Sequence, residues 1–390
     1  MFTHSFSQKI SDSLARFSVS HANTLSVHPF GIFMSRINTN FQLKADKNLS
    51  VTANISGGNI WLQRVKSDSP INKSDRNEVS KLNWYNRDGM IAFLNNAPTK
   101  TTKFEADGVI RLYQIQLNLP LSDQHEIKVN SRMFSLDGGK IPTSIVTNDE
   151  LIEWFHSNVA GGENPFARKA FEYDQAKIRY SDEEGKTFQI NSGDFIFSGI
   201  DLSYYYYPQF KSLEERSIYT NFGAQVGANL NDINPSFDLG LNGTIIKSIH
   251  LERERRFNVG LSVGAMRMQV LEYGEAVQLI TRKNLVNSEF LFEYLKHYKN
   301  KSLLSFAVSW ITQNSFNKKS DFETIILAGE RSTSHWHLAL SHLYDIRTSY
   351  NFMISYAKGD FSYSTYFRED FTVNNAPDTQ GGIGVKYYFK

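Results

Sequence analysis

The sequence predicts an all-β protein, a transmembrane antiparallel up-and-down β-barrel of about 12–14 strands with a helix in one long loop. Three observations predict it. Many segments alternate apolar with small or polar side chains, aromatic residues make up 14% of the chain, and the mean hydropathy is -0.39. No apolar run approaches the roughly eighteen residues that a membrane-spanning helix needs, so any crossing of a membrane has to be made by strands.

The last eleven residues show the pattern most clearly. One set is apolar and the other small or polar, as in a strand with one face on lipid and one on a polar lumen. The apolar set is Ile383, Val385, Tyr387 and Phe389, and the other set is Gly382, Gly384, Lys386 and Tyr388.

The same alternation recurs upstream. Residues 217–230 place Phe222 and Val226 on one side and Asn221 and Gln225 on the other. Most such segments supply the roughly 9–11 residues that a tilted strand needs to cross the hydrocarbon. The others are 104–121, 125–137, 236–250, 256–271, 304–313 and 335–341.

Composition narrows the class of protein. The 390 residues suit one large barrel as well as two or three ordinary domains, and 29 Phe with 19 Tyr suit aromatic girdles at two membrane interfaces. An aromatic-rich soluble β-sandwich is the alternative. The chain has no Cys, which excludes disulfides and thiolate metal sites, and a net charge of +2 indicates no nucleic-acid partner.

Outer-membrane barrels alternate short periplasmic turns with longer outer loops. Counting back from a last strand that descends to the periplasm assigns the turns 122–124, 252–255, 298–301, 332–334 and 358–360 to the periplasmic side. The outer side receives 231–235, 272–286, 315–321, 344–347 and 369–378, with two long excursions at 59–103 and 138–195.

We divide the chain into an N-terminal segment, 1–37, and a barrel, 38–390. The N-terminal segment lacks a clean strand and is either a plug in the lumen or a tail. The second excursion contains a predicted helix, capped by Thr147, Asn148 or Asp149, with an apolar stripe from Leu151 to Phe155. This helix lies either over or inside the barrel mouth or against the outer rim, and a hairpin around Glu183–Gly185 follows it.

The chain's start, Met1–Lys9, has no continuous apolar run and so no recognisable secretion signal. An outer-membrane protein must be exported, so we expect the precursor to begin upstream or the chain to be a mature or trimmed form. We expect a location in the outer membrane of a Gram-negative bacterium. The expected partners are outer-membrane lipid, the barrel-assembly machinery through the C-terminal strand, and a small solute.

Lumen-facing positions carry mixed charges and many amides, which suits either an aqueous pore or a filled interior. The predicted lumen-lining residues are Gln114, Gln116, Asn118, Glu126, Arg132, Asp201, Tyr219, Asn221, Gln225, Asp238, Asn242, Glu289, Glu293, His335, His337 and Ser341.

No catalytic set is convincing. His335, His337 and Ser341 share a face, but neither an acidic orienter nor an oxyanion motif accompanies them, so we interpret them as lumen lining. Two histidines at i and i+2 also need further ligands to hold a metal. We therefore predict no catalytic residue, no metal and no cofactor, and interpret Tyr204–Tyr207 as part of an aromatic girdle rather than a ligand site.

The predicted function is passage or binding of small solutes. Two alternatives stay open: a channel for hydrophobic compounds, like the fatty-acid transporters, and an outer-membrane enzyme that modifies lipids. A Ser, His and acid cluster would favour the enzyme, and a continuous lumen path without one would favour transport.

Several landmarks carry a resemblance to a known family. They are His28-Pro29-Phe30, Leu119-Pro120-Leu121, Leu136-Asp137-Gly138-Gly139, Leu151–His156 and Gly161-Gly162. The pattern resembles the uncharacterised bacterial family known as domain-of-unknown-function 3187, over roughly residues 25–205. The chain departs from it at His28, where the family tends to have Asn, and at the terminal Lys390. The resemblance implies an outer-membrane-type protein with no established activity.

Overall fold

The computed structural model describes residues 28–80, 92, 95–139, 147–159, 175–252, 254–279, 281–317, 346–370, 377 and 379–390. In chain order, its helices and strands are η1 (Pro29–Phe33), β1 (Ser50–Pro70), α2 (Lys73–Ser80), β2 (Thr99–Ser122), β3 (His125–Asp137), α4 (Asp149–Asn158), β4 (Lys177–Ser181), β5 (Thr187–Asn191), β6 (Phe195–Tyr206), α5 (Lys211–Glu214), β7 (Ile218–Asn229), β8 (Ser236–Leu251), β9 (Arg255–Glu272), β10 (Asn284–His297), β11 (Leu303–Gln313), β12 (Arg347–Lys358), β13 (Phe361–Glu369) and β14 (Gln380–Tyr388).

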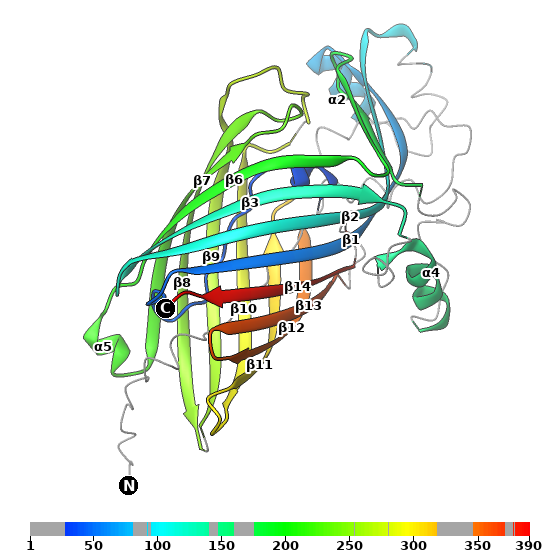
Figure 1. The fold of residues 1–390 in the computed structure, drawn as a ribbon. Coiled ribbons are helices and arrows are strands. Elements are labelled where there is room, and N and C mark those ends of the chain that lie inside the picture. Colours follow the sequence, from blue (N-terminus) through cyan, green and yellow to red (C-terminus); the bar gives the residue numbers. More distant parts are fainter. Residues whose placement is uncertain are drawn as a thin grey trace.

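Twelve strands, β1 to β3 and β6 to β14, close into an antiparallel barrel (Figure 1). At the seam, Ile55 of β1 is in register with Ile383 of β14 on one side and with Tyr113 of β2 on the other. Because the barrel is closed, backbone N–H and C=O groups of each strand find hydrogen-bond partners on neighbouring strands. This pairing allows a sheet to lie in hydrocarbon. The predicted barrel of about 12–14 strands is confirmed.

Side chains of the wall alternate between the lumen and the outside. On β7, Asn221 and Gln225 are buried, whereas Phe222 and Val226 are exposed on the outer face. The alternation continues through β8, β9, β10, β11 and β12. The apolar rows therefore face lipid and the amides and carboxylates face inward, as the sequence predicts.

The tyrosine run at the end of β6 divides by the same alternation. Tyr204 and Tyr206 are exposed on the outer face, where an aromatic girdle is expected, but Tyr205 and Tyr207 are buried in the lumen. The interpretation of the whole run as girdle is therefore wrong for half of it, because neighbouring residues of a strand point to opposite faces.

The short turns lie at the end of the barrel that holds the C-terminus, which is the periplasmic end in this class. In the wall, β11 pairs directly with β12. The register runs from Leu303 with Ala357 to Gln313 with Arg347. Residues 335–341 and the predicted turn 332–334 lie outside the described residues.

The outer excursions are shorter than predicted, because the strands continue beyond the barrel. β1 extends to Pro70 and β2 begins at Thr99. The predicted hairpin is present as β4 and β5, and β4 pairs with residues 103–107 of β2. The predicted helix is α4, capped by Asn148, whose side-chain oxygen accepts from the backbone N–H of Leu151 at 2.9 Å.

No helix in the described part of the chain is long and apolar enough to cross a bilayer.

The barrel begins later than residue 38. Residues 35–42 have no regular secondary structure, and β1 starts only at Ser50. The intervening chain contacts residues of the lumen wall instead of joining the ladder, and it forms the centre of the candidate site.

Candidate functional site

Residues 34–46, here called the lumen segment, run through the barrel from η1 near its outer end to the start of β1 at its periplasmic end (Figure 1). Its side chains and backbone bind residues of β3, β6, β7, β8, β10 and β14. The N-terminal segment thus supplies a plug, and the plug extends past the predicted boundary at residue 37.

An aromatic cluster holds the outer end of the plug. In η1, the ring of Phe30 lies 4.6 Å from that of Phe104 on β2 and 5.0 Å from that of Tyr180 on the β4–β5 hairpin. Phe33 packs edge-on against Phe134 of β3, with ring centroids 5.6 Å apart. These rings belong to the largest apolar cluster among the described residues, so η1 is packed between the upper wall and the hairpin.

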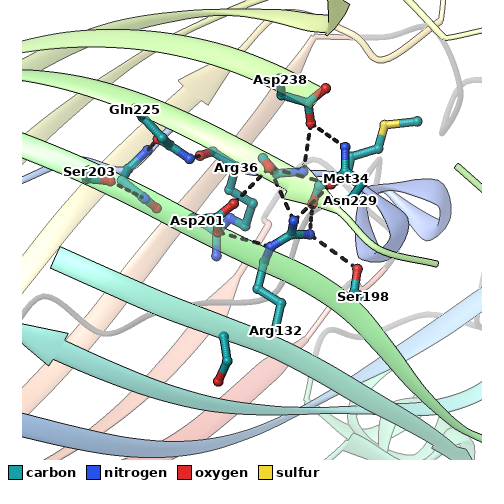
Figure 2. A network of polar contacts seen from close by, with 12 residues as sticks. Met34, Arg36, Arg132, Ser198, Asp201, Ser203, Gln225, Asn229 and Asp238 are labelled. Atoms are coloured by element: carbon teal, nitrogen blue, oxygen red, sulfur yellow. Dashed lines mark hydrogen bonds and ion pairs between the residues drawn. The ribbon is translucent and has the colours of Figure 1, made fainter. Parts of the chain in front are cut away.

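Arg132 of β3 is the hub of the polar contacts (Figure 2). Its Nε lies 3.0 Å from Oδ2 of Asp201 on β6. Its two Nη atoms donate to the carbonyl of Met34 at 2.6 Å and to Oγ of Ser35 at 3.2 Å. Because the guanidinium presents its donors as a rigid fork, one side chain joins the wall to the plug at several points.

Ser35 is bonded from both sides. Its Oγ donates to Oδ1 of Asp201 at 2.8 Å, and its backbone N–H donates to Oδ2 of Asp238 on β8 at 3.1 Å. Asn229 of β7 completes the network by accepting from Arg132 at 2.8 Å and donating to Asp238 at 2.7 Å. The buried carboxylates of Asp201 and Asp238 are therefore compensated by the guanidinium of Arg132 and by several neutral donors, as buried charges require.

Amide side chains of the wall bind the next residues of the plug. Gln225 donates to the carbonyl of Arg36 at 2.7 Å and accepts from the backbone N–H of Asn38 at 3.2 Å. Asn221 donates to the carbonyls of Asn40 at 2.9 Å and Gln42 at 3.1 Å. These amides satisfy backbone groups of a segment that has no strand partner.

The periplasmic end has its own charged anchor. Asp46 accepts from Nζ of Lys386 on β14 at 2.7 Å. Tyr207 donates to Glu126 at 2.8 Å and accepts from the side chain of Asn40 at the same distance. The plug is therefore tied to the wall at both ends of the lumen.

The opposite side of the plug is apolar. Phe41 and Leu43 form a buried cluster with wall residues of β8, β10, β11, β12 and β13. The wall residues of this cluster are Ile246, Leu291, Ala307, Met353 and Tyr366. The plug therefore contacts polar wall residues and, in addition, one apolar cluster of the wall that reaches from β8 to β13.

Two lumen-facing glycines leave space for the plug. A Cβ built on Gly227 of β7 would lie 1.6 Å from Oγ of Ser35, and one built on Gly264 of β9 would lie 2.3 Å from Cγ2 of Ile37. Real carbon atoms do not approach so closely, so any larger residue at either position conflicts with the plug. The wall is thus shaped around its occupant.

Most of the predicted lumen residues lie on the lumen face, and several contact the plug. Arg132, Asp201, Asn221, Gln225 and Asp238 bind it directly. Glu289 accepts from Oγ1 of Thr39 at 2.8 Å. Gln114, Gln116, Asn118, Glu126, Tyr219, Asn242 and Glu293 have the same inward orientation, buried or half-buried. His335, His337 and Ser341 lie outside the described residues.

Three contact residues were not predicted: Ser35, Asn229 and Ser198 of β6. Oγ of Ser198 accepts from Arg132 at 3.2 Å and donates to the carbonyl of Ile32. Serine and asparagine at inward positions carry no signal that separates a plug contact from ordinary lumen lining. The glycines do carry one, because an isolated glycine in a strand marks a close approach of another backbone.

No group of three His, Asp or Glu side chains in the described part of the chain could hold a metal ion.

The closed twelve-stranded wall, its outward apolar rows and its polar lumen define an outer-membrane β-barrel of the Gram-negative type.

No family model matches the sequence, and no curated protein is similar to it in sequence. Solved structures of similar shape include an outer membrane channel from Pseudomonas putida F1, with a TM-score of 0.40 and 8% identity over 90% of this chain and 100% of that one. The NanC porin has a TM-score of 0.36 and 7% identity over 72% of this chain and 93% of its own. The translocator domain of the autotransporter NalP from Neisseria meningitidis has a TM-score of 0.34 and 6% identity over 88% and 89%.

Proposed function

We propose that this barrel passes small solutes and that the lumen segment is its gate. The observation that carries the proposal is that the plug contacts the lumen wall on several strands through non-covalent contacts alone, while the twelve-stranded ladder closes without it. The segment precedes β1, so it can leave the lumen without any strand leaving the sheet. A barrel of this size is narrow enough for one extended segment to block it.

On this proposal the structure is that of the closed state. An ion path needs a continuous column of water, and the lumen segment is bonded to the wall from Arg132 at one end to Lys386 at the other. Opening requires loss of the contacts of Ser35 and its neighbours. Each neutral hydrogen bond contributes only about 0.5–1.5 kcal/mol net. A solute or partner that replaces several of these bonds therefore lowers the free energy of opening.

The first test is the conductance of two shortened chains in planar lipid bilayers. A chain that begins at Lys47 loses the lumen segment but keeps the seam contacts of Asn48 and Leu49 with Phe389. A chain that begins at His28 is the matched control, because it keeps η1 and the whole segment. We expect a steady current from the first and the same closed behaviour as the full chain from the second.

Folding is checked by heat-modifiable mobility in detergent gels. If the barrel that begins at Lys47 is folded and still carries no more current than the full chain, the proposed gate is wrong.

A second candidate is passage of hydrophobic compounds, and the apolar cluster of the wall favours it. Phe41 and Leu43 cover wall residues such as Leu291 and Met353, which would line the path once the segment has left. Swelling of liposomes in a pentose, compared with uptake of a hydrophobic fluorescent probe, separates the two candidates. Faster uptake of the probe alone supports the hydrophobic path.

The resemblance to domain-of-unknown-function 3187 and the engagement of the assembly machinery by β14 also remain proposals. The first concerns the family of the barrel and the second its insertion into the membrane. Neither changes the conductance test of the gate.

A further inference from the structure

The helix α4 is attached to the outside of the barrel wall. Oδ1 of Asp149, in its first turn, accepts from Nδ2 of Asn59 on β1 at 2.9 Å, and both residues are buried. Asn59 shares its face of β1 with Ile55, which is exposed toward lipid. The helix therefore starts against the outward face of the wall, which decides between the two predicted placements in favour of the outer rim.

One side of α4 is apolar and exposed. Trp154, Phe155 and Val159 are 54%, 45% and 58% exposed, whereas Ile152 is 3% exposed. At 100° per residue these four residues fall on one half of the helix, together with Leu151 and one polar residue, Asn158, and Glu150, Glu153 and Ser157 fall on the other. Ile152, at one edge of the apolar half, is buried, whereas Trp154, Phe155 and Val159 each keep roughly half of their surface exposed.

This exposed face lies close to the lipid-facing surface of the barrel. Asn59 lies four residues outward from Ile55 along β1, about 13 Å at the rise of a strand. Ile55 and its partner Ile383 are both exposed on the outer face, and the ring of Tyr113, in register with Ile55, lies 6.1 Å from that of Phe195. Figure 1 shows α4 outside the barrel, beside the outer ends of β1 and β14.

We propose that α4 is an interfacial helix, whose exposed apolar face lies in the outer leaflet of the membrane at the boundary between headgroups and acyl chains. Tryptophan is enriched at that boundary because its ring is apolar and its N–H is polar. A short amphipathic helix parallel to the surface buries its apolar face about 5–10 Å deep. The attachment through Asp149 and Asn59 holds the helix at this level.

The proposal is independent of the gate. It concerns the outer surface of the wall, and no contact of the lumen segment is part of it.

The test uses the absence of Cys from the chain. Single cysteines are introduced as Val159→Cys on the apolar side and Ser157→Cys on the polar side, labelled with an environment-sensitive fluorophore and reconstituted into phosphatidylcholine vesicles. Ile383→Cys on β14 is the reference within the hydrocarbon. Phospholipids carrying a nitroxide at known depths quench a label according to its position.

We expect the label at residue 159 to be quenched at least three times as strongly as that at residue 157, with the strongest effect from nitroxides nearer the surface than those that best quench residue 383. Equal weak quenching at 157 and 159 overturns the proposal. So does a label at 159 that becomes shielded only as the protein concentration rises, because a second copy would then cover this face.

A second measurement does not depend on labelling. Trp154→Ser with Phe155→Ser removes the two aromatic rings from the exposed face, and we expect a lower affinity of the outer excursion for the bilayer, seen as faster cleavage at this helix by protease added to vesicles. Glu150→Ser with Glu153→Ser is the control, with unchanged cleavage. Equal cleavage of both double variants and the unaltered chain would contradict a lipid-embedded face.

Discussion

Gly227→Val is expected to open the barrel to ions while leaving the wall folded. The added Cβ would lie 1.6 Å from Oγ and 2.5 Å from Cβ of Ser35, so rotation of the serine side chain cannot remove the conflict. The lumen segment has to move away from β7 at this point. That movement also pulls Ser35 away from Asp201 and Asp238.

The size of the effect follows from the cost of overpacking. Forcing additional carbon into a filled interior costs about 1–3 kcal/mol, which corresponds to roughly a 5- to 150-fold change in the ratio of open to closed molecules. The strand itself tolerates the change, because valine is favourable in a β-strand and the ladder of β7 is unaffected. We expect open probability in single-channel records to rise within this range.

Gly243→Val is the matched control. Gly243 lies on the lipid-facing side of β8, and a Cβ there would meet only the ring of Phe222 at 3.5 Å, an ordinary contact. This variant should behave like the unaltered chain. If Gly227→Val is folded and has the same conductance as Gly243→Val, the segment does not control the path.

The barrel wall was predictable because one of its faces contacts lipid and the other a polar lumen. A strand between lipid and a polar lumen has to change its side-chain chemistry at every residue, so the faces of β7, β8 and β9 can be assigned from alternation alone. Its lumen-facing residues, Asn221 and Gln225 among them, follow from the same rule.

The plug was only partly predictable, because it meets a polar and an apolar environment inside the barrel, as a strand of the wall does between lumen and lipid. Asn40 and Gln42 face the polar wall, while Phe41 and Leu43 face the apolar cluster. This alternation is the same as that of a strand, and the predicted boundary at residue 37 placed residues 38–49 in the barrel. What distinguishes them is the lack of a ladder partner, a property of the fold that no local pattern contains.

The number of strands is a second property that alternation alone does not determine. It depends on which strands pair with each other. β11 meets β12 directly. Local periodicity tests whether a segment can form a strand, whereas closure is decided by all strands together.

Arg132→Ala is expected to release the outer anchor of the plug and to destabilise the wall. It removes the ion pair with Asp201 and the donors to Met34 and Ser35, and it leaves the carboxylate of Asp201 buried without its guanidinium. Removing one partner of a buried ion pair costs about 3–5 kcal/mol. Urea unfolding of the protein in detergent micelles should show a loss of that size in the free energy of unfolding.

Two further variants separate the components of this loss. Arg132→Ala with Asp201→Asn no longer buries an uncompensated charge, so we expect it to recover part of the stability but not the closed state. Arg132→Lys keeps the charge but cannot donate to the wall and the plug with a fork, so its conductance should lie between those of Arg132→Ala and the unaltered chain.

Arg111→Ala decides whether Arg132 acts as a latch or only supports the wall. Arg111 forms a buried ion pair with Asp137, Nε to Oδ2 at 2.9 Å, between the neighbouring strands β2 and β3. Its loss should lower stability by a similar mechanism, because the buried carboxylate of Asp137 is also left without its guanidinium. If both variants lose stability but only Arg132→Ala conducts, the guanidinium of Arg132 holds the gate shut. If both conduct equally, a loosened wall and not a released plug accounts for the current, and the network around Ser35 is a structural feature of the barrel.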